Sequence, residues 1–328
     1  MSKYSIILPV RNGGTYVKEC VHSILAQTLP DFNLIVLDNC SSDGTTEWIQ
    51  SLQENRIVLH PSEKSLTIEE NWHRIIDIPK NEFMTMIGHD DILGPHYLEE
   101  MNRLIVSHPT ATLFQAHYDF IDGNGKEIRP CLPMDETQYA HEFLACQMAR
   151  TMESMGTGYM MRSRDYDDIG GMPSNYPNLI FADYELWIKL MLRGYKATTL
   201  RKCFSYRVHM SLSRTTNGAL YQEAFGKYIY YLKELMQKDQ NMQLVITRYG
   251  KQMLMYYCES LSHRLLKTPG KERSFKVAEF IRRCEWYARE IIPEQHFKPL
   301  ERFRIRIAKQ LDDFVLGRTL FNVFKKLT

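Results

Sequence analysis

The stretch Met84-Thr-Met-Ile-Gly-His-Asp-Asp-Ile-Leu93 joins an apolar run to two adjacent carboxylates. The run from Phe83 to Ile87 is long enough for one buried strand, and Asp90 and Asp91 follow its end. Two carboxylates this close repel each other unless a cation lies beside them, and Mg²⁺ or Mn²⁺ prefers such hard oxygen ligands. A solvated turn is the alternative, because an Asp pair ahead of Pro95 also suits helix capping.

Upstream of this stretch, strand and helix patterns alternate. Apolar runs typical of buried strands cover residues 4–10, 32–37, 57–59 and 83–87. Helical spacing of apolar residues follows each run, at residues 17–27, 45–52, 68–76 and 95–106. This order predicts an α/β fold with a mainly parallel sheet flanked by helices. Because ligands bind at the carboxyl ends of such strands, the position of Asp38, Asp90 and Asp91 at strand ends predicts a site there.

The second half of the chain changes character. Residues 111–121 alternate in a way that predicts an antiparallel or edge strand, and two further short strands are expected at 197–200 and 204–208. Helices are expected at 139–148 and from Ala182 to about Gly194. After Asn217 glycine and proline become rare and helical spacing continues to the end. We therefore expect an α/β domain at 1–216 and a helical C-terminal region at 217–328.

Composition narrows the class of protein. The 328 residues carry a net charge of +2, which is no footprint for nucleic acid, and the apolar and charged shares of 44% and 24% are those of a globular protein. The 7 cysteines show no CxxC pair, so neither a disulfide framework nor a zinc site is indicated. The first residues look like a strand and not a signal peptide, and no apolar stretch approaches 18 residues. These features predict a cytoplasmic protein.

Several stretches resemble the signature segments of the family 2 inverting glycosyltransferases of the GT-A fold. In chain order they are Ser5-Ile-Ile-Leu-Pro-Val-Arg-Asn-Gly13, Ser23-Ile-Leu-Ala-Gln-Thr28, Leu37-Asp-Asn-Cys-Ser-Ser-Asp-Gly-Thr45, Gly88-His-Asp-Asp91, Gly170-Gly171 with Ala182-Asp-Tyr-Glu-Leu-Trp187, and Tyr206-Arg-Val-His209 with Ser211 and Ser213. The resemblance covers about residues 3 to 215. It implies a GT-A (Rossmann-like) fold and transfer of a sugar, with inversion, from a nucleotide diphosphate sugar, assisted by Mg²⁺ or Mn²⁺.

The resemblance also implies residue roles at the nucleotide. Pro9, Arg11 and Asn12 begin the loop after the first strand, where a nucleotide would lie. Asp38 would accept a hydrogen bond from a base N–H, and Asp43 would act near the nucleotide. For both aspartates a purely structural role is open, because Asp38 could cap the next turn and Asp43 could start a helix.

For the metal, the resemblance implies that Asp90 and Asp91 hold the ion that neutralises the donor diphosphate, with Asp90 next to the nucleotide. Many relatives carry an acidic residue where this chain has Gly88, so the motif is reduced to the Asp pair. His209 would supply a further ligand or contact the diphosphate. A structural histidine in a strand is the alternative for that residue.

The catalytic base implied by the resemblance is Asp183, which would deprotonate the acceptor hydroxyl. Relatives often have Glu where this chain has Ala182. The alternative for Asp183 is a helix N-cap, and Glu185 is the second candidate for the base. A carboxylate near a helix N-terminus is favoured in its ionised form, so we expect Asp183 to be unprotonated at neutral pH.

The family also suggests an acceptor and partners. We expect a glycan or lipid-linked acceptor in bacterial surface polysaccharide synthesis, and we expect no binding of nucleic acid. Basic and apolar residues mix at 303–309 and 314–327, which suits contact with the inner face of an anionic membrane; packing on the catalytic domain or in a homo-oligomer is the alternative. A silent carbohydrate-binding scaffold and a sugar nucleotidyltransferase are the competing functions. The loop at residues 11–14 is short for the second.

Overall fold

The computed structural model describes residues 2–208, 217–269, 272–273, 275–314, 317 and 321. Contacts divide the chain into two compact units. The first consists of residues 1–143, 152–175 and 182–211, and the second of residues 144–151, 176–181 and 212–328. The domain limits expected from the sequence, 1–216 and 217–328, differ from these units mainly in the two short segments 144–151 and 176–181.

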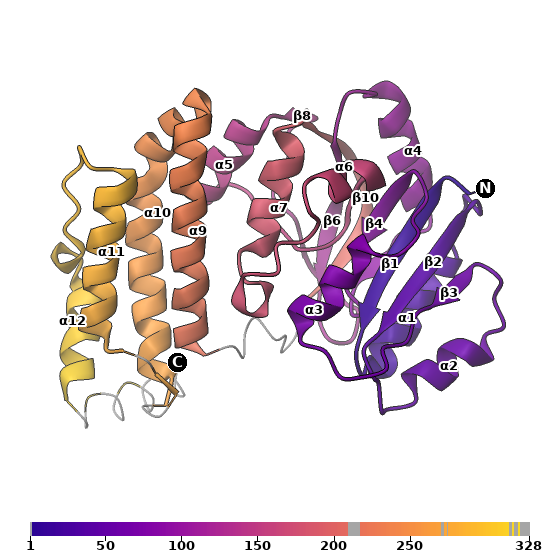
Figure 1. The fold of residues 1–328 in the computed structure, drawn as a ribbon, viewed down its shortest axis with the longest axis horizontal. Coiled ribbons are helices and arrows are strands. Elements are labelled where there is room, and N and C mark those ends of the chain that lie inside the picture. The colour runs from indigo at the N-terminus through magenta and orange to yellow at the C-terminus, as the bar shows by residue number, and fades with distance from the viewer. Residues whose placement is uncertain are drawn as a thin grey trace. The chain divides into compact units, whose positions relative to one another are not determined.

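The first unit is built on a ten-stranded sheet (Figure 1). Its main path runs β3 (Ile57–Leu59), β2 (Phe32–Asp38), β1 (Tyr4–Val10), β4 (Phe83–Met86), β9 (Tyr159–Arg162), β6 (Leu113–Ile121), β10 (Lys196–Arg207) and β5 (Ile92–Leu93). Off this path, β7 (Glu127–Pro130) pairs with β6 and β8 (Thr137–Gln138) with β10. Strands β3, β2, β1 and β4 are parallel, while β9 is antiparallel to both of its neighbours. The predicted mixed, mainly parallel sheet is confirmed.

Continuous apolar sequence explains the parallel half of the sheet. All seven residues of β1 are buried, as expected for a strand covered on both faces. The connecting helices are α1 (Gly14–Leu25), α2 (Thr45–Ser51), α3 (Ile68–His73), which continues as the 3₁₀ turn η1 (Arg74–Ile76), and α4 (Tyr97–Ser107). Helix α1 buries Val17, Val21 and Ile24 in the same core as the strands. Helix α3 begins with a capping box between Thr67 and Glu70.

One sequence prediction about strands is confirmed in part and another is wrong. Strand β6, expected to be antiparallel or at an edge, is antiparallel to β9 but lies between β9 and β10, and its alternation comes from its less buried C-terminal half. The two strands predicted at 197–200 and 204–208 are one strand, β10. The register of β10 shifts between Thr199 and Phe204, and Leu200 is 79% exposed. The polar residues that suggested a loop in the sequence lie at this irregularity of the strand.

The remaining helices complete the two units. The first unit contains α6 (Ser163–Asp168) and α7 (Ala182–Met191), and α5 (Ala140–Ala149) spans the limit between units. The second unit contains the 3₁₀ turns η2 (Pro177–Leu179) and η4 (Pro299–Glu301), and helices α9 (Gly218–Lys238), α10 (Gln240–Lys267), α11 (Val277–Ile291) and α12 (Phe303–Asp313). Asn217 caps α9 by accepting from Ala219 N and Leu220 N, both at 3.0 Å. Inside this unit the Phe181 ring stacks on Tyr228 at 5.3 Å.

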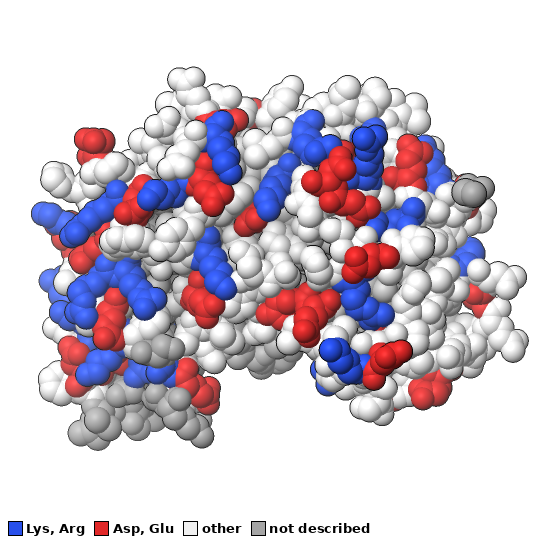
Figure 2. Space-filling model, viewed as in Figure 1, with Lys and Arg blue, Asp and Glu red and all other residues white. Residues whose placement is uncertain are grey.

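Surface charge and the C-terminal helix bear on the expected membrane contact. Figure 2 shows basic and acidic side chains interspersed over the viewed face. Within the described ranges, no helix has the length and apolarity needed to cross a bilayer. Helix α12 buries Ile305 and Ala308, and its Asp312 accepts from Arg273 Nη1 at 2.7 Å, so this helix packs within its own unit. Residues 314–327 lie mostly outside the described ranges, and membrane contact stays a prediction.

Candidate active site

Asp38 ends β2 at the carboxyl edge of the sheet, in register with Val10 of β1. Its side chain is 2% exposed, and Oδ2 accepts from Ser41 N at 3.2 Å. The other oxygen, Oδ1, is buried and has no hydrogen-bond partner in the described part of the chain. Because a buried carboxylate oxygen without a donor is costly, this atom fits a donor from a bound ligand.

The loops after β1 and β2 are fastened to each other. Asn12 has a left-handed backbone with φ of 52°, its N–H donates to Ser41 Oγ at 2.9 Å, and its Oδ1 accepts from Ser42 N at 2.8 Å. Pro9 is buried in β1, whereas Arg11 is exposed. The structure therefore brings the predicted nucleotide residues of both loops to one edge of the sheet, beside Asp38.

Asp43 holds the same two loops together. Its Oδ1 accepts from the Thr45 hydroxyl at 2.6 Å and from Thr45 N at 3.1 Å, while Oδ2 accepts from Gly14 N at 2.9 Å. Slight burial opposes ionisation, but these hydrogen bonds outweigh it and lower the pKa of Asp43. The contacts fit the structural alternative for this residue; contact with a nucleotide stays a prediction.

The Asp pair lies in the turn between β4 and β5. Asp91 is 2% exposed, and its oxygens accept from Thr157 Oγ1 at 2.8 Å and from Arg207 N at 3.0 Å. Burial, followed by the charge of Asp90, raises the pKa of Asp91 well above its usual range. A cation bound beside the pair would oppose both effects and favour the ionised form.

Arg207 lies within the stretch Tyr206-Arg-Val-His209, but the sequence did not indicate its role. Its fully buried side chain donates to Asp90 O at 2.7 Å, to the carbonyls of Asp122 and Gly123 at 3.2 Å, and to Glu19 Oε2 at 2.6 Å. It therefore ties the Asp90–Asp91 turn to the β6–β7 turn and to α1.

Gly88 is the residue that lets the two carboxylates converge. A β-carbon on Gly88 would lie 2.7 Å from Asp90 Oδ1 and 3.1 Å from Asp91 Oδ2. Both carboxylates thus face one point, an oxygen-rich donor set that fits Mg²⁺ or Mn²⁺. No group of three or more His, Cys, Asp or Glu among the described residues could hold a metal ion, and His209 lies outside those residues. The remaining ligands would have to come from the substrate, from water or from that part of the chain.

Asp183 lies in the first turn of α7 and faces the loop that precedes β9. A β-carbon on Gly156 would lie 3.8 Å from Asp183 Cβ and 4.0 Å from its Oδ2. Burial raises the pKa of Asp183 to about 7, although hydrogen bonds from the Tyr184 and Asp183 backbone N–H groups act in the opposite direction. The expectation of a fully ionised carboxylate at neutral pH was wrong, because burial outweighs the helix N-terminus.

The loop at residues 152–158 contacts both Asp183 and Asp91. Gly156 faces Asp183, and the next residue, Thr157, donates to Asp91. Trp187 fastens this loop to α7 by donating from Nε1 to Met155 O at 2.8 Å. Apart from the flanking glycines, nothing in the sequence marks Thr157, because its role depends on how this loop folds.

Glu185, the second candidate for the base, is buried and forms an ion pair with Lys189 one turn along α7. Lys189 thus occupies one oxygen of the Glu185 carboxylate, Oε1, as its ion-pair partner. The geometry therefore favours Asp183 over Glu185 for proton abstraction.

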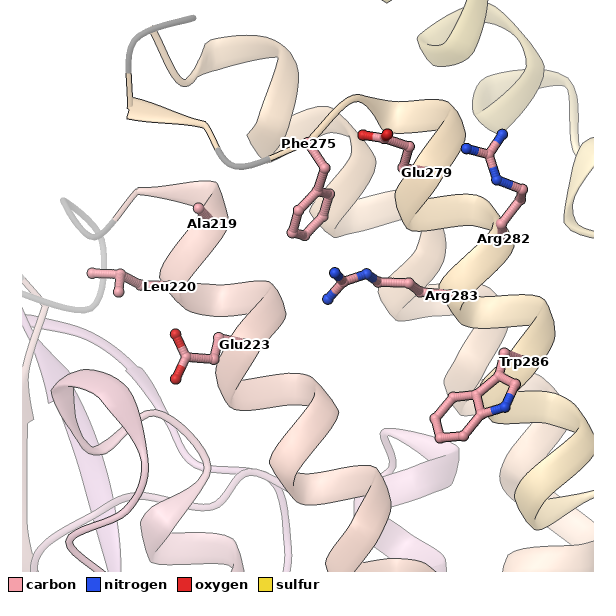
Figure 3. Close-up of a pocket in the computed structure, with 8 residues that line it drawn as sticks. All are labelled: Ala219, Leu220, Glu223, Phe275, Glu279, Arg282, Arg283 and Trp286. Carbon is pink, nitrogen blue, oxygen red and sulfur yellow. The ribbon is translucent and has the colours of Figure 1, made fainter.

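A separate hollow of about 660 Å³ lies in the helical unit (Figure 3). Its lining comes from α9, from α11 and from Phe275, which lies two residues before α11; the lining residues are Ala219, Leu220, Glu223, Phe275, Glu279, Arg282, Arg283 and Trp286. Glu223 pairs with Lys227, the Arg283 guanidinium lies 4.4 Å from the Phe275 ring centroid, and Glu279 accepts from Lys276 N. The hollow contains none of the predicted site residues.

Known proteins that this chain resembles in sequence are named as glycosyltransferases. The chain is 27% identical over 124 residues to the glycosyltransferase GlyG of Streptococcus pneumoniae, covering 37% of the chain and 41% of GlyG. It is 24% identical over 207 residues to the putative teichuronic acid biosynthesis glycosyltransferase TuaG of Bacillus subtilis, covering 62% of the chain and 78% of TuaG. The matched part is thus less than half of GlyG, and 31% of an uncharacterized glycosyltransferase of Rickettsia felis.

Solved structures share the fold. The structure of S. aureus TarS 1–349 in complex with UDP-GlcNAc superposes with a TM-score of 0.68 at 13% identity, covering 99% of this chain and 92% of that one. The mannosyltransferase PcManGT from Pyrobaculum calidifontis, solved with GDP-Man and Mn²⁺, gives a TM-score of 0.50 at 13% identity, covering 99% of this chain and 88% of that one. Residues 5–170 match the family described as Glycosyl transferase family 2. The chain therefore belongs to glycosyl transferase family 2.

Proposed function

We propose that the protein transfers a sugar, with inversion, from a nucleotide diphosphate sugar to a hydroxyl of a glycan or lipid-linked acceptor. The observation that carries this proposal is the Gly156–Thr157 dipeptide, which faces Asp183 on one side and binds Asp91 on the other. These two consecutive residues thereby link the base for the acceptor to the charged site for the leaving diphosphate. A displacement reaction requires both groups to be held near the same anomeric carbon.

Each residue has a chemical part in this reaction. Asp183 accepts the proton of the acceptor hydroxyl as that oxygen bonds to the anomeric carbon on the face opposite the diphosphate. The bond from the anomeric carbon to the diphosphate oxygen breaks, and its electron pair leaves with the nucleotide. Asp90 and Asp91 would hold Mg²⁺ or Mn²⁺, which neutralises charge on that leaving group. Thr157 and Arg207 hold Asp91 in place.

Relatives and neighbours support a class of donor and pathway. TarS and PcManGT were solved with UDP-GlcNAc and GDP-Man respectively, and TuaG is named for teichuronic acid biosynthesis. We therefore infer a nucleotide-activated sugar and an acceptor in bacterial surface polysaccharide synthesis. A thermal-shift screen of UDP- and GDP-sugars with Mn²⁺ tests the donor class; stabilisation by none of these sugars would contradict it.

Asp38→Ala is expected to weaken binding of the nucleotide diphosphate by about 1–3 kcal/mol, because a buried base N–H would lose its acceptor. Isothermal calorimetry with UDP and GDP measures this loss. Asp77→Ala is a control that removes an exposed aspartate between η1 and β4. An unchanged affinity in Asp38→Ala would assign Asp38 to the turn alone.

A further inference from the structure

Several buried polar atoms without hydrogen-bond partners lie on neighbouring strands of the first unit. Among the described residues they include Gln115 Nε2 and the Tyr118 hydroxyl on β6, the Tyr159 hydroxyl on β9, and Ser154 Oγ in the loop at 152–158. Strands β6 and β9, which carry Gln115, Tyr118 and Tyr159, pair directly. Because buried polar groups are nearly always satisfied in folded proteins, unpaired atoms in one region point to bound water.

Tyr159 is the member that approaches Asp183. Its ring centroid lies 4.4 Å from that of Trp187, which follows Asp183 by one turn on α7. Burial raises the pKa of the Tyr159 hydroxyl, and the charge of Asp183 raises it further, so the hydroxyl is a protonated donor within electrostatic reach of the carboxylate. Ser154, the Met155 backbone and Gln115 act on the same hydroxyl, although none of them meets the geometry of a hydrogen bond to it. Polar groups placed in this way suit a bridging water.

We propose that Tyr159 is a positioning residue for Asp183, acting through internal water held by Gln115, Ser154 and Tyr159. The Tyr159 hydroxyl donates to this water, and the water donates to the Asp183 carboxylate. The bridge orients the carboxylate toward the acceptor and favours its ionised form. The inference rests on the proposed role of Asp183 as the base.

Other charged groups near this cluster have partners of their own. Glu153 pairs with Arg129, and Glu185 pairs with Lys189. Asp91 is held by Thr157 and Arg207. Lys196 Nζ donates to Gln115 Oε1 at 3.0 Å, which orients the amide so that Nε2 is left for the water. Removing only the Tyr159 hydroxyl therefore changes the surroundings of Asp183 without breaking an ion pair.

Tyr159→Phe tests the bridge, because the ring contact with Trp187 is kept and only the hydroxyl is lost. The pKa of Asp183 is followed by carboxyl ¹³C NMR of aspartate-labelled full chain, and Asp183→Asn assigns its signal. We expect the titration midpoint to rise by about half a pH unit or more, as for the loss of one hydrogen bond to the charged form. Tyr4→Phe is the control, because it removes a buried hydroxyl that donates to Asn102 Oδ1 at 2.6 Å, and its midpoint should not move.

Ser154→Ala gives a second reading should Tyr159→Phe fold poorly, and it should shift the midpoint in the same direction. An unchanged midpoint in both variants would overturn the bridge. This readout needs neither donor nor acceptor. If the bridge fails while Asp183→Asn still abolishes turnover, the proposed base stands; if Asp183→Asn leaves turnover intact, the base fails whatever the midpoint does.

Discussion

Asp183→Asn is expected to slow sugar transfer by about 10²–10⁴-fold while leaving nucleotide-sugar binding near normal. The amide keeps the shape of the side chain and its hydrogen bonds at the start of α7 but cannot accept the proton of the acceptor hydroxyl. With no acceptor identified, release of UDP from UDP-GlcNAc or of GDP from GDP-Man, with water as the acceptor, measures the rate. Calorimetry with the same donors measures binding.

The pH dependence follows from the same carboxyl group. Burial raises the pKa of Asp183 to about 7, and only the ionised form can act as a base. Activity should therefore be full well above pH 7 and fall as the pH drops through that value, and Asp183→Asn should lose this dependence. Glu185→Gln is the matched comparison. If it, and not Asp183→Asn, removes turnover, the base is Glu185.

Removal of the divalent metal is the second change with a large expected effect. EDTA should abolish turnover and Mn²⁺ or Mg²⁺ should restore it, because the leaving diphosphate would otherwise carry its charge unneutralised. Asp90→Ala should be at least as damaging as chelation and should not be rescued by added Mn²⁺. Release of the nucleotide from the donor is the readout in each case.

A milder change tests how the metal pair is held. Thr157→Val keeps the size of the side chain and removes the hydrogen bond to Asp91 Oδ2, so a higher Mn²⁺ concentration should be needed for half-maximal rate. Thr67→Val, at the capping box of α3, is a control that removes a hydroxyl without touching the pair. Full activity of the untreated protein in EDTA would contradict the metal assignment altogether.

Local sequence determined the parallel half of the fold. The run from Tyr4 to Val10 and the run from Ile57 to Leu59 form strands with the predicted bounds, because a continuous apolar segment between turn residues has few other options. The convergence of Asp38 with Asp90 and Asp91 at one edge follows from that topology. Strand β10 was divided in two because its register shift depends on pairing with β6, which a single segment does not reveal.

The site was less predictable where it depends on tertiary burial. Asp183 was placed by resemblance, but burial raises its pKa, so a rule about helix N-termini gave the wrong sign. Thr157, Tyr159 and Arg207 received no role because their partners lie 28 to 188 residues away along the chain. Side chains of this kind are recognised only when the contacts are seen.

The proposed inversion at the anomeric carbon, with Asp183 as the base, can be followed by proton NMR of the sugar released early in turnover. Mn²⁺ is present, and water or the natural acceptor is the nucleophile. From an α-linked donor such as UDP-GlcNAc, we expect a β-configured product that Asp183→Asn does not form. An α-configured product, or equal turnover by Asp183→Asn, would contradict it.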